Sequence, residues 1–212
     1  MGGTHPRTIV SEIDAVIFDL GNVLVRVDEA KACRRFAART GRAETDIEQY
    51  FRRTPHATQL SLGKLSGRQF HRIVADDLGF DGSFEEFALL WSDIFEPIEP
   101  MIELATTLDG RLPRAILSNT NALHIEFIFA RFPVIRKFGA HILSHEVGWL
   151  KPDATIYRVA LDSCGWNAER TLFVDDLPAN VEGARTVGMR ALQFESAEQV
   201  RRELTKLGVA PI

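Results

Sequence analysis

The sequence lacks several features that would mark particular classes of protein. Its 212 residues include only two cysteines, Cys33 and Cys164, and neither belongs to a CxxC pair, so we expect no zinc site and no thiol–disulfide motif. No apolar run approaches the roughly 18 residues that a membrane-spanning helix needs. No long run of lysine or arginine offers a surface for nucleic acid. These absences predict a cytoplasmic protein with reduced cysteines that binds neither membranes nor nucleic acid.

Apolar sequence is present in the amount that a large core requires. Hydrophobic residues make up 45% of the chain, and the formal net charge is −4. This composition predicts one sizeable domain, or a core domain that carries an insertion. Residues 1–13 hold no apolar centre of a signal peptide, and we assign them to a flexible arm. Both a monomer and a homodimer remain open.

The stretch DAVIFDLGNVLV, residues 14–25, is the one around which the rest of the chain is organised. A short, β-branched apolar run ends at Asp19 and breaks at Gly21 and Asn22. Such a run is typical of a parallel strand that is buried on both faces. Ligands bind at the C-terminal ends of strands in such sheets, and an unpaired buried carboxylate is costly there. Asp19 is therefore a candidate functional residue, although an aspartate that only caps the next turn would give the same pattern.

Helical periodicity follows the first strand. The spacing of apolar residues predicts helices over residues 28–40, 45–53, 66–78 and 83–95, and Ser83 with Glu86 fits a capping box. After Pro97 and Pro100, short apolar strands at residues 114–117, 141–143, 171–174 and 190–194 alternate with helical segments. This alternation predicts an α/β fold, with a parallel sheet and helices on both faces. The expected domains are an α/β core, residues 14–27 and 97–212, and a helical insert, residues 28–96.

Polar side chains follow the predicted strands at four places: Asp19, Ser118, Lys151, and Asp175 with Asp176. Right-handed crossovers bring the C-terminal ends of parallel strands to one edge of the sheet, so these groups should meet. Carboxylates are suited to hold Mg²⁺, and an ammonium group offsets the charge of a phosphate dianion. Asp19 is then placed to attack phosphorus and form an aspartyl-phosphate.

Four stretches resemble, in order, the four motifs of the haloacid dehalogenase superfamily: FDLGNVLV, ILSNTN, VGWLKPDATIY and LFVDDLPANVEGARTVGM. The resemblance extends over nearly the whole chain from residue 14, including a helical cap of the C1 type inserted after the first motif. DLGNV and LSNTN are similar to the small sugar-phosphate phosphatases, a group that includes an α-glucose-1-phosphate phosphatase. The resemblance implies a Rossmann-like core beneath the cap. It also implies a Mg²⁺-dependent phosphomonoester hydrolase that acts on a small phosphorylated metabolite such as a sugar phosphate.

The resemblance also assigns roles to individual residues. Asp19 matches the nucleophile, Ser118 the phosphate ligand of the second motif, and Lys151 the lysine of the third. Asp176 matches the main magnesium ligand, with Asp175 beside it as a ligand or supporting group, and the backbone carbonyl of Gly21 matches a third ligand. The phosphate-binding set implied around these positions is Ser118, Asn119, Lys151, Gly21 and Asn22. Asn180 is expected to support the acidic loop through a hydrogen bond, and His124 is assigned to a helix and not to the chemistry.

The chain departs from the usual phosphatase pattern at Gly21. Most phosphatases of the superfamily carry a second aspartate there, which protonates the leaving group. General acid–base help is worth about 10²–10⁴-fold. The enzyme is therefore slow, or it uses esters whose leaving oxygen needs little protonation, or the cap supplies the proton through His56 or His71. We favour the second explanation. Candidates in the cap for contact with the rest of the substrate are Arg52, His56 and Gln59, in and around an expected loop at residues 54–59.

Two other functions remain as alternatives. A 2-haloacid dehalogenase also uses an aspartate nucleophile but no metal, and Asp175 with Asp176 argue against it because carboxylates repel a departing halide. A weakly active or non-catalytic phosphate-binding protein is the other alternative, since Gly21 replaces the usual acid.

Overall fold

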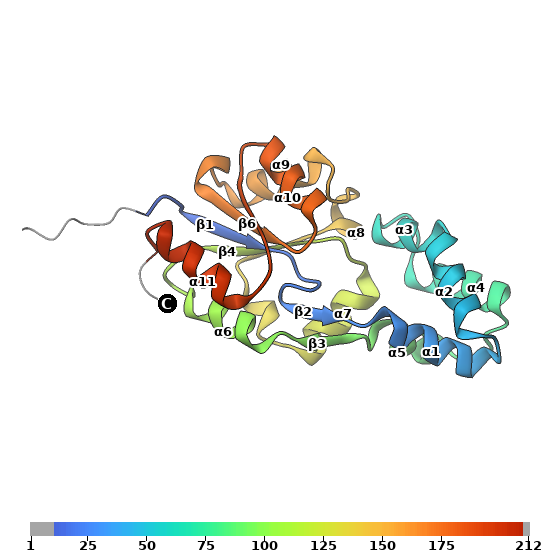
Figure 1. Ribbon diagram of the computed structural model, residues 1–212. Coiled ribbons are helices and arrows are strands. Elements are labelled where there is room, and N and C mark those ends of the chain that lie inside the picture. The colour runs from blue at the N-terminus through green and yellow to red at the C-terminus, as the bar shows by residue number, and fades with distance from the viewer. Residues whose placement is uncertain (1–10, 210–212) are drawn as a thin grey trace, which may run out of the picture.

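The computed structural model describes residues 11–209 and places a five-stranded parallel sheet beside a separate group of helices (Figure 1). The strand order is β5-β4-β1-β6-β7. The strands are β1 (Ala15–Phe18), β4 (Arg114–Ser118), β5 (Ala140–Leu143), β6 (Thr171–Asp175) and β7 (Arg190–Gln193). This arrangement confirms the predicted α/β class. None of the helices in the described part is both long enough and apolar enough to span a bilayer.

Helices cover both faces of the sheet, which explains why the central strands β1, β4 and β6 are buried along their whole length. Figure 1 shows α9 (Ala154–Cys164) and α10 (Pro178–Thr186) on one face, and α6 (Glu99–Thr107) and α11 (Ala197–Lys206) on the other. Successive residues of β1 point to opposite faces, so Ile17 belongs to the cluster under α9 while Phe18 belongs to the cluster on the other side. Both residues are fully buried.

Five helices occupy most of the region between β1 and β4. They are α1 (Glu29–Thr40), α2 (Glu44–Arg53), α3 (His56–Ser61), α4 (Gly67–Leu78) and α5 (Phe84–Ser92). Aromatic side chains form their core, as the periodicity predicted: the ring of Phe36 meets those of Phe51, Phe80 and Phe87 edge-on at centroid distances of 5.4, 5.6 and 5.5 Å. Edge-to-face pairs of this kind add to the stabilisation that burial already provides. The remaining helices are α7 (Ala122–Arg131) and α8 (Ser144–Val147), with short 3-10 turns at Ile135–Lys137 and Ala168–Arg170.

The helical region differs from the sequence prediction at three points. Helix α5 ends at Ser92, not at residue 95, because Phe95 pairs with Val27 in a two-stranded ribbon of β2 (Val25–Val27) and β3 (Phe95–Pro97). The capping box at Ser83 is only half formed, since the Glu86 carboxylate binds Arg39 at 2.6 Å instead. Helix α3 includes most of residues 54–59, which were expected to form a loop.

The predicted N-terminal arm is too long by three residues. Residues 1–10 lie outside the described part of the chain. Ile13, in contrast, is buried, and the backbone N–H of Glu12 donates to the carbonyl of Leu207 at 2.8 Å. Residues 11–13 therefore belong to the α/β core domain, because burying the apolar side chain of Ile13 lowers its free energy relative to exposure to water.

The helices α1–α5 touch the core at the sheet edge where the strands end. The buried hydroxyl of Ser144 lies 2.7 Å from the carbonyl of Ser61 on α3, and it accepts the backbone N–H of Thr120 at 2.9 Å. Gly63 has a φ of +68°, and a Cβ at this position would lie 2.1 Å from the carbonyl oxygen of His145. Only glycine satisfies both conditions. This contact holds α3 beside the polar strand ends.

Candidate active site

The strand ends bring three of the predicted residues into direct contact. Asp19 follows β1 and Asp175 ends β6, and the pairing of Phe18 with Val174 places the two residues level on neighbouring strands. The ammonium group of Lys151 lies between them, 2.7 Å from Asp19 Oδ1 and 2.6 Å from Asp175 Oδ2. The Lys151 side chain is 1% exposed. Because both partners of each ion pair are buried, solvent screens these pairs much less than it screens ion pairs on a protein surface.

Asp175 is occupied by protein partners on both of its carboxylate oxygens. Oδ1 accepts the backbone N–H of Leu177 at 2.9 Å, and the side-chain amide of Asn180 donates to Oδ1 at 2.9 Å and to Oδ2 at 3.1 Å. Asn180 thus supports the acidic loop, as predicted. The carbonyl of Asn180 in turn accepts the hydroxyl of Tyr157 at 2.8 Å. Asp175 therefore fixes Lys151 in place, and it does so from a fully buried position.

Asp19 has one held oxygen and one free one. Its Oδ1 accepts the backbone N–H of Leu20 at 2.7 Å as well as the Lys151 ammonium group. Among the described residues, no partner is recorded for Oδ2, which leaves that oxygen available for chemistry. Burial raises the pKa of Asp19 to about 7; the Asp175 charge adds to the rise, and the Lys151 charge opposes it.

Three carboxylates form a group that fits a hard divalent cation. One oxygen each from Asp19, Asp175 and Asp176 lies within 4.8 Å of the other two. Asp176 is half-buried, and burial followed by the nearby Asp175 charge raises its pKa. The Asn22 side-chain amide donates to its carboxylate over a long distance, 3.4 Å. An oxygen-rich, partly desolvated group of this kind matches the ligand preference of Mg²⁺, and the residues present therefore fit the metal.

The loops beside the carboxylates place the remaining predicted residues. Asn22 has a φ of +55°, a conformation that asparagine tolerates better than most residues, and it turns the chain back after Gly21. Ser118 ends β4 and is buried. Asn119 uses its side-chain amide to bind the Lys151 backbone on both sides, at 2.9 and 2.8 Å. That amide therefore positions the lysine loop.

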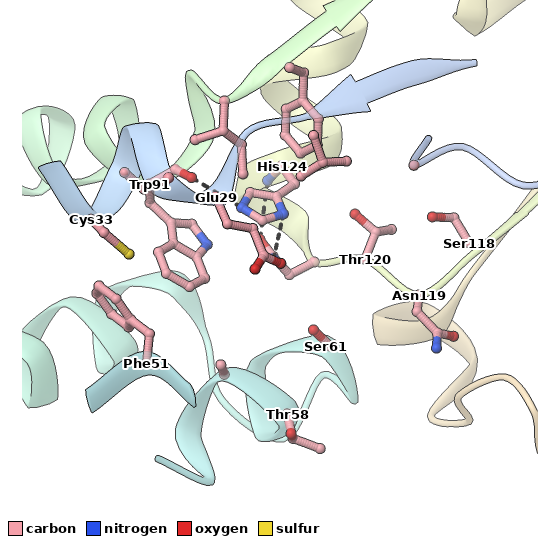
Figure 2. Close-up of a pocket in the computed structure, with 18 of the residues that line it drawn as sticks. Glu29, Cys33, Phe51, Thr58, Ser61, Trp91, Ser118, Asn119, Thr120 and His124 are labelled. Atoms are coloured by element: carbon pink, nitrogen blue, oxygen red, sulfur yellow. Dashed lines mark hydrogen bonds between the residues drawn. The ribbon is translucent and has the colours of Figure 1, made fainter. Parts of the chain in front are cut away.

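A cavity of about 780 Å³ opens beside these loops, between the core and the helices α1–α5. Gly21, Ser118 and Asn119 line it on the core side. Figure 2 shows Ser118, Asn119 and Thr120 on one side of the space, with Cys33, Phe51 and Trp91 on the opposite side and Thr58 and Ser61 on α3. The volume falls in the range of about 300–1,000 Å³ that is usual for small-molecule sites.

The residues suggested from sequence for substrate contact are only partly at this cavity. Arg52 lines it. His56 and Gln59 are not among the lining residues and pair with each other, with His56 Nδ1 3.2 Å from Gln59 Oε1. His71 packs against Phe87 inside the helical group, 5.0 Å between ring centroids. Neither histidine therefore lines the space where a substrate would be protonated.

Several side chains that line the cavity were not among the candidates proposed from the sequence: Glu29, Glu44, Glu48, Trp91 and His124. The glutamates resemble ordinary solvent-facing positions of α1 and α2. His124 stacks on Trp91 with ring centroids 5.3 Å apart, and its Nε2 donates to the Trp91 carbonyl at 3.2 Å. Burial lowers the pKa of His124 to about 4, so the ring is neutral at pH 7 and joins α7 to α5.

Comparison with known proteins agrees with this fold. A sequence model of the haloacid dehalogenase-like hydrolases matches residues 13–188. A D-ribitol-5-phosphate phosphatase of Bacteroides thetaiotaomicron is 28% identical over 201 residues, which cover 91% of this chain and 97% of that protein.

Two solved structures share the fold. A haloacid dehalogenase family enzyme of Bacteroides thetaiotaomicron, in complex with magnesium and inorganic phosphate, superposes with a TM-score of 0.79 at 22% identity, over 86% of this chain and 94% of that one. An L-2-haloacid dehalogenase of Xanthobacter autotrophicus gives a TM-score of 0.62, also at 22% identity, over 94% and 85%. With the family match covering most of the chain, the protein belongs to the haloacid dehalogenase-like hydrolases.

Proposed function

We propose that the protein is a Mg²⁺-dependent phosphatase that hydrolyses the phosphomonoester of a small sugar or polyol through an aspartyl-phosphate on Asp19. The observation that carries the proposal is the buried contact of Lys151 with Asp19 and Asp175, at 2.7 and 2.6 Å, beside a third carboxylate on Asp176. A lysine held this way supplies a fixed positive charge at the point where a phosphate dianion must approach an anionic nucleophile. Such preorganised charge is the usual source of the largest part of catalysis.

The chain's own groups have separate tasks in this proposal. The free oxygen of Asp19 attacks phosphorus in line, forming the bond to phosphorus as the bond to the ester oxygen breaks; the leaving oxygen departs as an alkoxide and takes its proton from water. Lys151 and the hydroxyl of Ser118 contact the phosphoryl oxygens. Water then attacks the aspartyl-phosphate, which releases inorganic phosphate and restores the carboxylate. The helices α1–α5 act as a cap that keeps bulk water away from this intermediate.

The metal would be held by Asp19, Asp176 and the Gly21 carbonyl, with Asp175 beside it. When bound, Mg²⁺ would offset the charge of the phosphate dianion and favour the anionic form of Asp19. The support for this assignment is the group of carboxylate oxygens within 4.8 Å of one another, together with the magnesium present in the similar Bacteroides structure.

The choice of a small sugar or polyol ester rests on two further observations. The relative that matches over most of this chain is named for ribitol 5-phosphate, and DLGNV with LSNTN is similar to the group that includes an α-glucose-1-phosphate phosphatase. The cavity beside Ser118 is large enough for either type of leaving group. We therefore take sugar and polyol monophosphates together as the substrate class.

A panel of phosphate esters tests this function. With Mg²⁺ present, we expect release of inorganic phosphate from p-nitrophenyl phosphate and from at least one sugar or polyol phosphate. Treatment with EDTA should lower both rates by more than about 100-fold, and added Mg²⁺ should restore them. Release of chloride from 2-chloropropionate in EDTA, without phosphatase activity, would instead identify a dehalogenase. No turnover of any ester at millimolar concentration would contradict the proposal.

The glycine at position 21 leads to a second prediction, which concerns the leaving group. No side chain stands at this position to protonate the departing oxygen, so esters of acidic alcohols should react fastest. We expect kcat/KM for p-nitrophenyl phosphate to exceed that for n-propyl phosphate by about 10²–10⁴-fold, the usual worth of a general acid. The measurement is phosphate release from both esters by one preparation, with Mg²⁺ in excess. Equal values would show that another group donates the proton.

A further inference from the structure

We propose that the cavity selects phosphate esters whose leaving group carries no second negative charge, and that Glu29, Glu44 and Glu48 make this selection. The inference rests on the proposed phosphatase function and deepens it, because it names the chemistry of the part of the substrate that does not react. It predicts that polyol and sugar monophosphates are accepted while esters that also carry a carboxylate or a second phosphate are rejected.

The charges around the cavity carry the argument. Three carboxylates line it, on Glu29, Glu44 and Glu48. Arg52 is the one cation among the described lining residues, and its Nη2 lies 2.5 Å from Glu48 Oε1, so its charge offsets one of the three carboxylates. His124 adds no charge, since it is neutral at pH 7. The cavity wall that faces the catalytic loops is therefore net negative, and a second anion on the substrate would meet like charges there.

Two of these glutamates stand at the starts of helices. Glu29 lies in the first turn of α1 and Glu44 in the first turn of α2. The unsatisfied N–H groups at a helix N-terminus favour a negative charge in that turn. The three side chains are exposed, so solvent screens each one and a single charge should have a modest effect. The selection should therefore come from the three together.

Neutral polar groups of the same cavity favour a leaving group with hydroxyls. A hydroxyl on the leaving group can donate to a carboxylate, whereas a carboxylate on the substrate could not donate to any glutamate. Thr58 and Ser61 offer further hydroxyls on α3.

A matched pair of substrates tests the selection. Sorbitol 6-phosphate and 6-phosphogluconate are both open-chain six-carbon monophosphates, and they differ at C1, where a CH₂OH group is replaced by a carboxylate. We expect kcat/KM for the first to exceed that for the second by at least about tenfold. Raising the ionic strength from about 0.1 to about 1 M shortens the Debye length from about 10 to about 3 Å, and this should reduce the ratio.

Glutamine variants assign the effect to the three glutamates. In a protein carrying Glu29→Gln, Glu44→Gln and Glu48→Gln, the ratio should fall at least about fivefold, and by less in each single variant. The control carries Glu85→Gln, Glu103→Gln and Glu126→Gln, three exposed positions that do not line the cavity, and it changes the net charge by the same amount. Its ratio should equal that of the wild type.

The outcomes separate this inference from the function on which it rests. Because both substrates are measured on one preparation, the ratio is independent of how active a variant is. Equal turnover of the two substrates by the wild-type protein would overturn the proposed selection and leave the phosphatase function standing. So would equal ratios in the triple variant of the cavity glutamates and in the triple control variant. If no ester at all releases phosphate, including p-nitrophenyl phosphate, both proposals are wrong.

Discussion

Asp19→Asn should lower the rate of phosphate release by at least about 10⁴-fold, the usual scale for loss of a covalent nucleophile. The amide cannot form the acyl phosphate that the carboxylate forms, because its nitrogen and oxygen are both poor nucleophiles at neutral pH. The substitution keeps the shape of the side chain, and Oδ1 still accepts the backbone N–H of Leu20. Lys151 also keeps its partner on Asp175, so the strand ends should stay in place.

The loss is to be measured with p-nitrophenyl phosphate and Mg²⁺, with the aryl ester chosen because it needs least help from an acid at position 21. Asp14→Asn is a matched control: Asp14 comes just before the other end of β1, where it is exposed and pairs with Arg170. That variant should retain wild-type activity. If Asp19→Asn loses less than about tenfold, water must attack phosphorus directly, and Asp19 would only position the phosphate.

The sequence predicted that the polar groups of the site would lie close together, because each follows a strand of the predicted parallel sheet. Asp19, Ser118 and Asp175 each stand at the end of an apolar run, and parallel strands put such ends on one edge. The side chains of Asp19, Lys151 and Asp175 do meet there. The partners of each side chain could not be predicted, however. Asp175 binds Lys151, Leu177 and Asn180, and this depends on side-chain geometry that the spacing of residues in the sequence does not reveal.

The cavity was harder to predict than the strand ends for a physical reason. Glu29 and Glu44 stand in the first turns of amphipathic helices, where acidic residues are expected for capping alone. They become cavity residues only because α3 docks on the core through Ser144 and Gly63, a contact between segments far apart in the chain. The end of α5 was mispredicted for a related reason, since Phe95 is drawn into a strand by its long-range pairing with Val27.

Lys151→Met should strongly destabilise the fold. Its ammonium group is the shared partner of Asp19 and Asp175, and both aspartates are buried. Methionine fills a similar volume but leaves the two carboxylates facing each other without a cation. Removing one partner of a buried ion pair costs about 3–5 kcal/mol, most of it from the charge that remains. Phosphatase activity should be lost as well.

The free energy of unfolding, measured with urea at pH 8 and with EDTA present, checks this prediction. Lys137→Met is the control, since Lys137 is exposed, and it should unfold at the wild-type urea concentration. Adding Asp175→Asn to Lys151→Met removes one of the two stranded charges. The double variant should therefore be more stable than the sum of the single losses predicts, by about 1–3 kcal/mol. Strict additivity of the two substitutions would mean that water reaches the site, and that the contact between lysine and aspartate stabilises the fold no more than an ordinary surface pair.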